Sequence, residues 1–246
     1  EQSFYINDDL LYQGHFGQDI ELAKIDDLNT SDAIVVWAED LKEKIPVLYL
    51  RVRQAVKKGV KLIVFGHTNE TLSDIADVFY DKETVSENFE IIKDVSKLKD
   101  IKNYVVGKNV TAIIGKSTPQ QSDNSVTKLF EFLQSNANTK ILNAYTKGNT
   151  YGAFQTLENI KGTSDFVEDV SSENTDLLFV VGADPVGRSF YSNEIKTILE
   201  KLNNVVSLDM FSHETAELSD YVIPMSSTLG EKEGTFTNIE FRTSRI

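Results

Sequence analysis

The residues best suited to chemistry follow an apolar run in the last third of the chain. Gly182-Ala183-Asp184-Pro185 comes directly after Leu177-Leu178-Phe179-Val180-Val181, a run typical of a buried strand. A glycine in this place lets the chain turn sharply and lets a ligand approach the backbone. The Asp184 carboxylate could accept hydrogen bonds from a purine or pterin ring, or it could cap the turn together with Pro185. The residues leave both roles open.

Three other groupings resemble catalytic or phosphate-binding motifs. Gly115-Lys116-Ser117-Thr118 matches the end of a phosphate-binding loop, but Val110 stands where that motif requires its first glycine, so we interpret it as a polar turn. His67 and His213 each have Ser and Asp neighbours, yet the chain has no G-x-S-x-G nucleophile elbow. The acidic run Asp165–Asp169 is typical of a solvated surface loop. We therefore predict no catalytic residue and no metal ligand.

Composition excludes further classes of chemistry. The chain has 246 residues, a net charge of −13, 3 histidines and no cysteine. The missing cysteines exclude disulfides, thiolate metal sites, cysteine nucleophiles and Cys-ligated iron–sulfur clusters within these residues. The negative charge argues against a nucleic acid or an anionic membrane surface as the main partner. No segment has the length and apolarity of a membrane span, and no signal peptide is apparent.

The elements that position these residues form repeated strand–helix–strand units. Apolar runs that predict buried strands alternate with segments in which apolar residues recur at helical spacing. Pro46 suits the first turn of the first helix and Gly59 its end, while Ser122 or Asp123 and Ser192 are expected to cap the later helices. The predicted strands are 33–38, 60–65, 110–114, 141–145, 177–181 and 205–208. This pattern predicts an α/β fold with Rossmann-like, doubly wound parallel sheets.

Two of these units repeat polar residues at a nearly constant offset. Asp32 and Asp176 precede matching strands and lie 144 positions apart, and Asp40 and Asp184 follow those strands at the same offset. Glu70-Thr71 and Glu214-Thr215 are also 144 positions apart, and each pair leads to an Asp at position 77 or 220. Ligands of doubly wound sheets bind at the carboxyl ends of strands. The repeat therefore favours two pseudo-equivalent halves built round a two-part ligand, or descended from such an arrangement.

The C-terminal motifs resemble a known family. Asp176 through Pro185 is followed by Glu214-Thr215-Ala216, by Ser219-Asp220-Tyr221-Val222-Ile223-Pro224 and by Glu231-Lys232-Glu233-Gly234-Thr235-Phe236-Thr237-Asn238. This order resembles the molybdopterin oxidoreductase superfamily. Within it, Asp32–Trp37 with Ile45–Leu48, and Lys140–Gly152, are most similar to the large molybdopterin-oxidoreductase-like subunit in the peripheral arm of bacterial respiratory complex I, the NADH-quinone oxidoreductase.

The resemblance implies a scaffold whose electron carriers lie elsewhere in the protein. Active members hold a bis-pterin molybdenum or tungsten cofactor between two Rossmann-like halves. The complex I subunit keeps that scaffold, and its iron–sulfur clusters are expected in a cysteine-rich N-terminal region outside this chain. Ala38-Glu39-Asp40-Leu41 replaces the loop with which active members contact the cofactor. We therefore expect no cofactor in this segment, with Gly182, Asp184, Asp209, Glu214 and Thr215 as vestigial pterin-site candidates.

Taken together, these features predict a structural segment of a peripheral-arm subunit that supports electron transfer from NADH to quinone. The alternative is a fragment of an active molybdenum or tungsten oxidoreductase such as a formate dehydrogenase. Expected partners are other peripheral-arm subunits, with no nucleic acid and no direct membrane insertion, on the cytoplasmic side of the inner membrane. The expected division is a lead-in at 1–30, a first Rossmann-like half at 31–80, a middle unit at 81–170, a second half at 171–224 and the start of a truncated C-terminal domain at 225–246.

Overall fold

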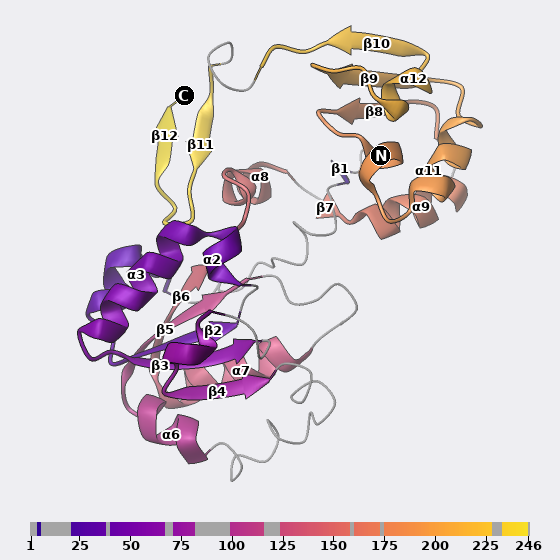
Figure 1. Cartoon of the computed structure of the whole chain (residues 1–246). Coiled ribbons are helices and arrows are strands. Elements are labelled where there is room, and N and C mark those ends of the chain that lie inside the picture. The colour runs from indigo at the N-terminus through magenta and orange to yellow at the C-terminus, as the bar shows by residue number, and fades with distance from the viewer. Residues whose placement is uncertain are drawn as a thin grey trace. The chain divides into compact units, whose positions relative to one another are not determined.

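The computed structural model divides the chain into two compact units, each considered by itself. The five-stranded unit comprises Tyr12–Tyr151 and Thr237–Arg242, and the three-stranded unit comprises Glu1–Leu11, Gly152–Phe236 and Thr243–Ile246. Both contain parallel sheets with helices packed against them (Figure 1). The structure describes residues 4–5, 21–37, 40–66, 71–81, 99–115, 124–157, 160–172, 175–227 and 233–245.

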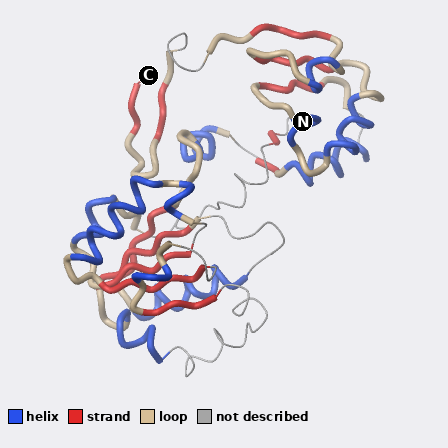
Figure 2. Tube along the Cα trace, viewed as in Figure 1, coloured by secondary structure: helices blue, strands red, loops and turns tan. Residues whose placement is uncertain are grey.

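The five-stranded unit is built on a parallel sheet with strand order β4-β3-β2-β5-β6. Figure 2 shows its strands side by side with helices around them. The central strand β2 pairs Val35 with Ile63 of β3 on one side and with Ala112 of β5 on the other. The strands are β2 (Ala33–Trp37), β3 (Lys61–Gly66), β4 (Val78–Asp81), β5 (Asn109–Ile114) and β6 (Asn138–Asn143).

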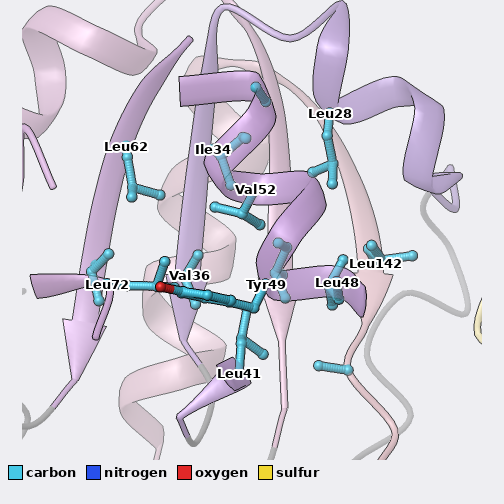
Figure 3. Close-up of a cluster of buried hydrophobic side chains, with 14 of the residues drawn as sticks. Leu28, Ile34, Val36, Leu41, Leu48, Tyr49, Val52, Leu62, Leu72 and Leu142 are labelled. Carbon is cyan, nitrogen blue, oxygen red and sulfur yellow. The ribbon is translucent and has the colours of Figure 1, made fainter. Parts of the chain in front are cut away.

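One face of this sheet is covered by α3 (Pro46–Lys57), which forms as its sequence predicts. Pro46 occupies the first turn, where its missing N–H has no cost, and Gly59 adopts a φ of 101° beyond the last turn. Figure 3 shows Leu48, Tyr49 and Val52 of the helix directed at apolar side chains of the strands. The short elements η1 (Ile25–Asn29), α2 (Leu41–Lys44) and η2 (Ser73–Ile75) lie in the same unit.

The opposite face is covered by α6 (Lys99–Val105) and α7 (Asn124–Asn136). Both helices send buried apolar side chains to the sheet, among them Ile101 and Leu133. Strands buried on both faces are apolar throughout because neither face meets water. The residues of this second layer are Ala33, Val35, Trp37, Ile63, Phe65, Val110, Ala112 and Ile114 with Ile101, Val105, Leu129, Leu133 and Ile141.

The three-stranded unit repeats part of this plan. Its parallel sheet has the order β10-β9-β8, with β8 (Leu178–Val181), β9 (Val205–Asp209) and β10 (Tyr221–Pro224). The helices are α9 (Thr163–Ser172), α10 (Pro185–Arg188), α11 (Ser192–Leu199) and α12 (Glu214–Glu217). A single described core joins Val180 and Val205 of the sheet to Phe166 of α9 and Ile195 of α11.

The predicted α/β class with parallel Rossmann-like sheets is confirmed. The division of the chain differs from the expected one, because strands of segment 81–170 pair with those of segment 31–80 in one sheet. The reason is that β5 pairs with β2 along the edge opposite β3. Strand pairing between distant segments is not visible in the local sequence pattern. The remaining elements are β1 (Phe4–Tyr5), α8 (Thr150–Thr156), β7 (Ile160–Lys161), β11 (Thr235–Thr237) and β12 (Thr243–Arg245).

Several local expectations are wrong. The acidic run Asp165–Asp169 lies in α9 and buries Phe166, because apolar residues at helical spacing outweigh the neighbouring charges. Ser192 is the first residue of α11 rather than its cap, and its hydroxyl donates to the Val186 carbonyl. Only Val180 of the apolar run 177–181 is buried.

Candidate functional site

The predicted site residues converge at the carboxyl edge of the three-stranded sheet. Gly182 follows β8, and its N–H donates to the Leu208 carbonyl of β9 over 2.8 Å. Asp209 is the last residue of β9, and Thr215 lies in the first turn of the next helix, α12. Gly182 has a φ of 59°, a left-handed conformation that favours glycine. The strand ends of a parallel sheet therefore bring together residues far apart in the sequence.

Asp184 caps α10 and uses one carboxylate oxygen for several donors. Its Oδ1 accepts from the Gly187 N–H at 3.1 Å, from the Thr215 hydroxyl at 2.7 Å and from the Thr215 N–H at 3.3 Å. Gly187 has to be small, because a Cβ there would lie 2.2 Å from Asp184 Oδ2. A glycine three residues after an aspartate is a signal for this cap that sequence reasoning missed.

Thr215 is fully buried and links the two strand-end loops. Its hydroxyl donates to Asp184 and accepts from the Val186 N–H over 3.0 Å. The Thr215 carbonyl in turn accepts from the Ser219 hydroxyl at 2.9 Å. Of the two roles open for Asp184, the geometry supports the structural one, because these internal donors occupy its Oδ1.

Asp209 and His213 lie at the same edge, with 12% and 15% of their side chains exposed. Asp209 Oδ1 accepts from the N–H groups of Met210 and Phe211 at 2.6 and 3.1 Å. Its Oδ2 lies 3.2 Å from His213 Nε2. His213 caps α12, since its Nδ1 accepts from the Ala216 N–H at 3.2 Å. Nδ1 also lies 3.3 Å from Asp184 Oδ1.

Both carboxyls at this edge are held in the charged form. Burial raises the pKa of Asp184, but the hydrogen bonds from Thr215 and Gly187 and the nearby His213 outweigh it, so the pKa lies below its usual value. Burial likewise raises the pKa of Asp209, and the Phe211 and Met210 N–H groups with His213 bring it below the usual value. The edge therefore presents anionic acceptors near neutral pH.

The surroundings of Asp209 favour a flat ring with N–H donors. Met210 and Phe211, directly after it, are exposed apolar side chains, and Glu214 is exposed at the start of α12. Carboxylate oxygens accept from N–H groups such as those on the edge of a purine or pterin. Phosphate groups fit less well, because Asp184, Asp209 and Glu214 would oppose their charge.

The matching loops of the five-stranded unit explain the polar repeat. Asp40 caps α2 by accepting from the Lys42 N–H at 2.8 Å, and the Thr71 hydroxyl donates to it at 3.2 Å. Asp77 accepts from the Leu62 N–H as Asp220 accepts from the Val205 N–H, over 3.0 and 2.8 Å. The threonine-to-aspartate bonds, and those of Asp77 and Asp220, thus recur in both units, so the repeat by itself does not indicate a two-part ligand.

Several residues considered in the sequence lie outside the described parts of the chain. They are Ala38, Glu39, His67, Glu70, 116–119, Ser122, Asp123, Glu231 and Lys232. Within the described ranges, no group of three or more His, Cys, Asp or Glu residues is arranged to hold a metal ion. The same ranges contain no helix that is both long and apolar enough to cross a membrane.

Known proteins share sequence with this chain. Residues 2–246 match the family described as molybdopterin oxidoreductase. The F420-dependent formate dehydrogenase 2 subunit alpha of Methanococcus maripaludis is 35% identical over 104 residues, covering 38% of this chain and 15% of that protein. The assimilatory nitrate reductase catalytic subunit of Bacillus subtilis is 36% identical over 86 residues, covering 34% and 12%. The F420-dependent formate dehydrogenase subunit alpha of Methanocaldococcus jannaschii is 36% identical over 78 residues, covering 32% and 11%. The matched part is thus a small fraction of each relative.

Proposed function

Because the chain belongs to the molybdopterin oxidoreductase family, we propose that it is part of the catalytic subunit of a formate-dehydrogenase-type enzyme. Two of the relatives named above are formate dehydrogenase alpha subunits and the third is a nitrate reductase catalytic subunit. The observation in the structure that carries the proposal is the strand-end edge at Gly182 and Asp209, which suits the edge of a pterin or purine ring. The substrate and electron acceptor belong to the whole protein.

The family name implies a molybdopterin group, and the donor set fits one part of it. Asp209 would accept N–H groups of a pterin or of an attached purine through Oδ2, and Gly182 would let the ring approach the backbone. When bound, such a group supplies the metal-centred redox chemistry. Asp209 and Gly182 would bind and orient its ring. This proposal differs from the expectation that the segment contacts no cofactor.

A second candidate is the structural role in NADH-quinone oxidoreductase that the sequence resemblance suggests. One observation favours it: Asp184, the first candidate for ligand contact, uses its Oδ1 for internal donors. None of the three relatives named above is a complex I subunit. We place this candidate second because the relatives named above are formate dehydrogenase and nitrate reductase subunits.

Metal and activity measurements on the full-length protein separate the two candidates. The formate-dehydrogenase-type reading predicts stoichiometric molybdenum or tungsten by elemental analysis, together with formate-dependent reduction of an artificial electron acceptor. A protein purified with intact iron–sulfur clusters but without molybdenum or tungsten supports the structural role. Molybdenum or tungsten without formate-dependent reduction of the acceptor would support a cofactor site and contradict formate as the substrate.

A pair of aspartate variants in the same protein tests the contact itself. Asp209→Asn replaces one acceptor oxygen by an N–H₂ group, so we expect the molybdenum or tungsten content to fall by about tenfold. Asp220→Asn is the matched control, because Asp220 accepts from Val205 at the other end of β9. Equal metal content in both variants, with both folded, would remove Asp209 from the site.

A further inference from the structure

One face of the three-stranded sheet carries apolar side chains that meet solvent. Phe179 is 56% exposed and Val181 is 58% exposed on β8, while Tyr221 and Ile223 on β10 are 64% and 47% exposed. We call these four residues the open face. The core of this unit lies on the other side of the sheet, where α9 and α11 pack (Figure 1). Contiguous apolar patches of this kind mark interaction surfaces more often than scattered apolar residues do.

The five-stranded sheet shows how the same face looks when it is covered. The open face begins with Phe179, which pairs with Val206 of β9, and Val206 pairs with Tyr221 of β10. In the matching register of the five-stranded sheet, Val35 pairs with Ile63, which pairs with Val78. The next row of paired residues on this face is Val181, Leu208 and Ile223 in the three-stranded sheet. In the five-stranded sheet it is Trp37, Phe65 and Tyr80.

In the five-stranded unit this face lies under two helices. Val35, Trp37, Ile63 and Phe65 are buried there, with Val78 and Tyr80 packed against them. The covering side chains come from α6, which precedes β5, and from α7, which follows it. No described helix of the three-stranded unit takes the place of α6 or α7, and the open face is exposed for that reason.

β8 also lacks a neighbouring strand that β2 has. β2 pairs with β3 on one edge and with β5 on the other, whereas β8, within the described residues, pairs only with β9. Leu178 and Gly182 donate their N–H groups toward β9. Because alternate N–H groups of a strand point to opposite edges, those of Phe179 and Val181 point to the free edge. An open edge beside an apolar face is a template for a further strand.

We propose that the free edge of β8 and the open face receive a strand and a covering helix from a part of the same polypeptide outside residues 1–246. In the five-stranded unit, the equivalent strand and helices belong to the same chain as the sheet. The 104 aligned residues make up only 15% of the Methanococcus maripaludis relative, so proteins of this family have ample additional chain. The inference concerns assembly of the sheet and holds whether or not the proposed function does.

The chemistry of the occupant follows from the surface it covers. Its strand runs parallel to β8 and is mostly apolar, as β5 is, because both faces become buried. Its helix presents an apolar stripe to Phe179, Val181, Tyr221 and Ile223 and a polar face to water. Two copies of this chain joined edge to edge about a twofold axis would pair β8 with β8 in antiparallel fashion and would leave the open face without a helix.

Single cysteine substitutions test the proposal, since the 246-residue chain contains no cysteine. Val181→Cys is placed both in this chain and in the full-length protein, and thiol labelling at position 181 is followed by peptide mapping, so that other cysteines do not interfere. We expect rapid labelling in the short chain and labelling slower by roughly 100-fold in the full-length protein, because labelling then requires local opening. Lys196→Cys, at an exposed position of α11, is the control and should label equally in both.

Hydrogen exchange on the unsubstituted proteins gives a second readout that does not depend on a cysteine substitution. The Phe179 and Val181 amides should exchange fast in the short chain and slowly in the full-length protein. Equal exchange and equal labelling in both would overturn the proposal. Protection that appears in the short chain as its concentration rises would assign the surface to a second copy. Protection of the full-length protein only when another subunit is added would assign it to that subunit. Either result rejects the same-chain occupant.

Discussion

The two sheets of this protein share a motif and differ in what surrounds it. The shared motif consists of three neighbouring parallel strands in the same register, β2, β3 and β4 in one sheet and β8, β9 and β10 in the other. In both, an aspartate after the first strand caps a short helix and accepts from a threonine hydroxyl. In the five-stranded unit both faces of the motif are buried, whereas the three-stranded unit has its described core on one face. The short polar contacts are thus common to both units, and the layers around them are not.

The polar contacts also differ in depth. Thr215 is fully buried and bonds to Asp184 and Val186, whereas Thr71 is partly exposed and its hydroxyl donates to Asp40 over the longer distance of 3.2 Å. Hence the unit with the thinner apolar core has the tighter strand-end hydrogen bonds. Hydrogen bonds and burial are separate contributions to stability, and the following substitutions measure them one at a time.

The largest difference is expected from deleting the same side chain on the same face of the two sheets. Phe65 is fully buried, with its ring 5.1 Å from that of Trp37 and 5.0 Å from that of Tyr80. Phe65→Ala should therefore lower the free energy of unfolding of its unit by about 3–5 kcal/mol. Phe179→Ala, on the open face, should change that of the three-stranded unit by no more than about 1 kcal/mol.

Denaturant unfolding followed by two probes measures this pair. The single tryptophan of the chain, Trp37, reports the five-stranded unit by fluorescence, and hydrogen exchange of peptides from 178–209 reports the other. Losses of similar size for the two phenylalanines would mean that the open face is covered in the isolated chain, contrary to the exposure on which the comparison rests.

How far the sequence predicts this difference depends on the range of the interactions. Pro46 and Gly59 mark the ends of α3 correctly, because their effects are local. The apolar run of β8 reads like that of β2, yet only Val180 of β8 is buried, because burial depends on whether another strand and helix arrive from elsewhere in the chain. The bond between Asp184 and Thr215 spans 31 residues and follows from the register of the strands. The sequence placed both residues at the strand ends without showing that they satisfy each other.

The second prediction compares the two threonine hydroxyls. Thr215→Val keeps the shape of the side chain but leaves the Val186 N–H without its acceptor and Asp184 without its shortest donor. We expect a loss of about 2–3 kcal/mol in the three-stranded unit. Thr71→Val, its counterpart, should cost at most about 1 kcal/mol in the five-stranded unit, because the partly exposed Asp40 carboxylate can accept from water instead. Equal costs in chemical denaturation would show that the strand-end contacts are equivalent after all.

The third prediction concerns the residue that makes room for the Asp184 carboxylate. A methyl group at Gly187 would lie 2.2 Å from Asp184 Oδ2, so Gly187→Ala should displace the carboxylate and cost about 1–2 kcal/mol, despite the better helix propensity of alanine. The counterpart in the other unit is Glu43, where Asp40 bonds to the Lys42 N–H instead. Glu43→Ala should change stability by less than about 0.5 kcal/mol. A stable Gly187→Ala protein would show that the capping loop adapts.

The smallest effect is expected from the two carboxyls at the strand-end edge, and it is measured as a loss of stability on acidification. Asp184 and Asp209 both have a pKa below the usual value of about 4, chiefly because their hydrogen bonds outweigh the cost of burial. A carboxyl with a lower pKa in the folded than in the unfolded chain stabilises the fold above its unfolded pKa. That stability is lost as pH falls through the folded pKa. The three-stranded unit should therefore lose stability below about pH 4.

In the Asp184→Asn, Asp209→Asn double variant this dependence of stability on pH should flatten, while the five-stranded unit keeps its own acid transition. Hydrogen exchange at a series of pH values, corrected for the intrinsic rate, resolves the two units. An unchanged slope in the double variant would place the acid-sensitive groups elsewhere.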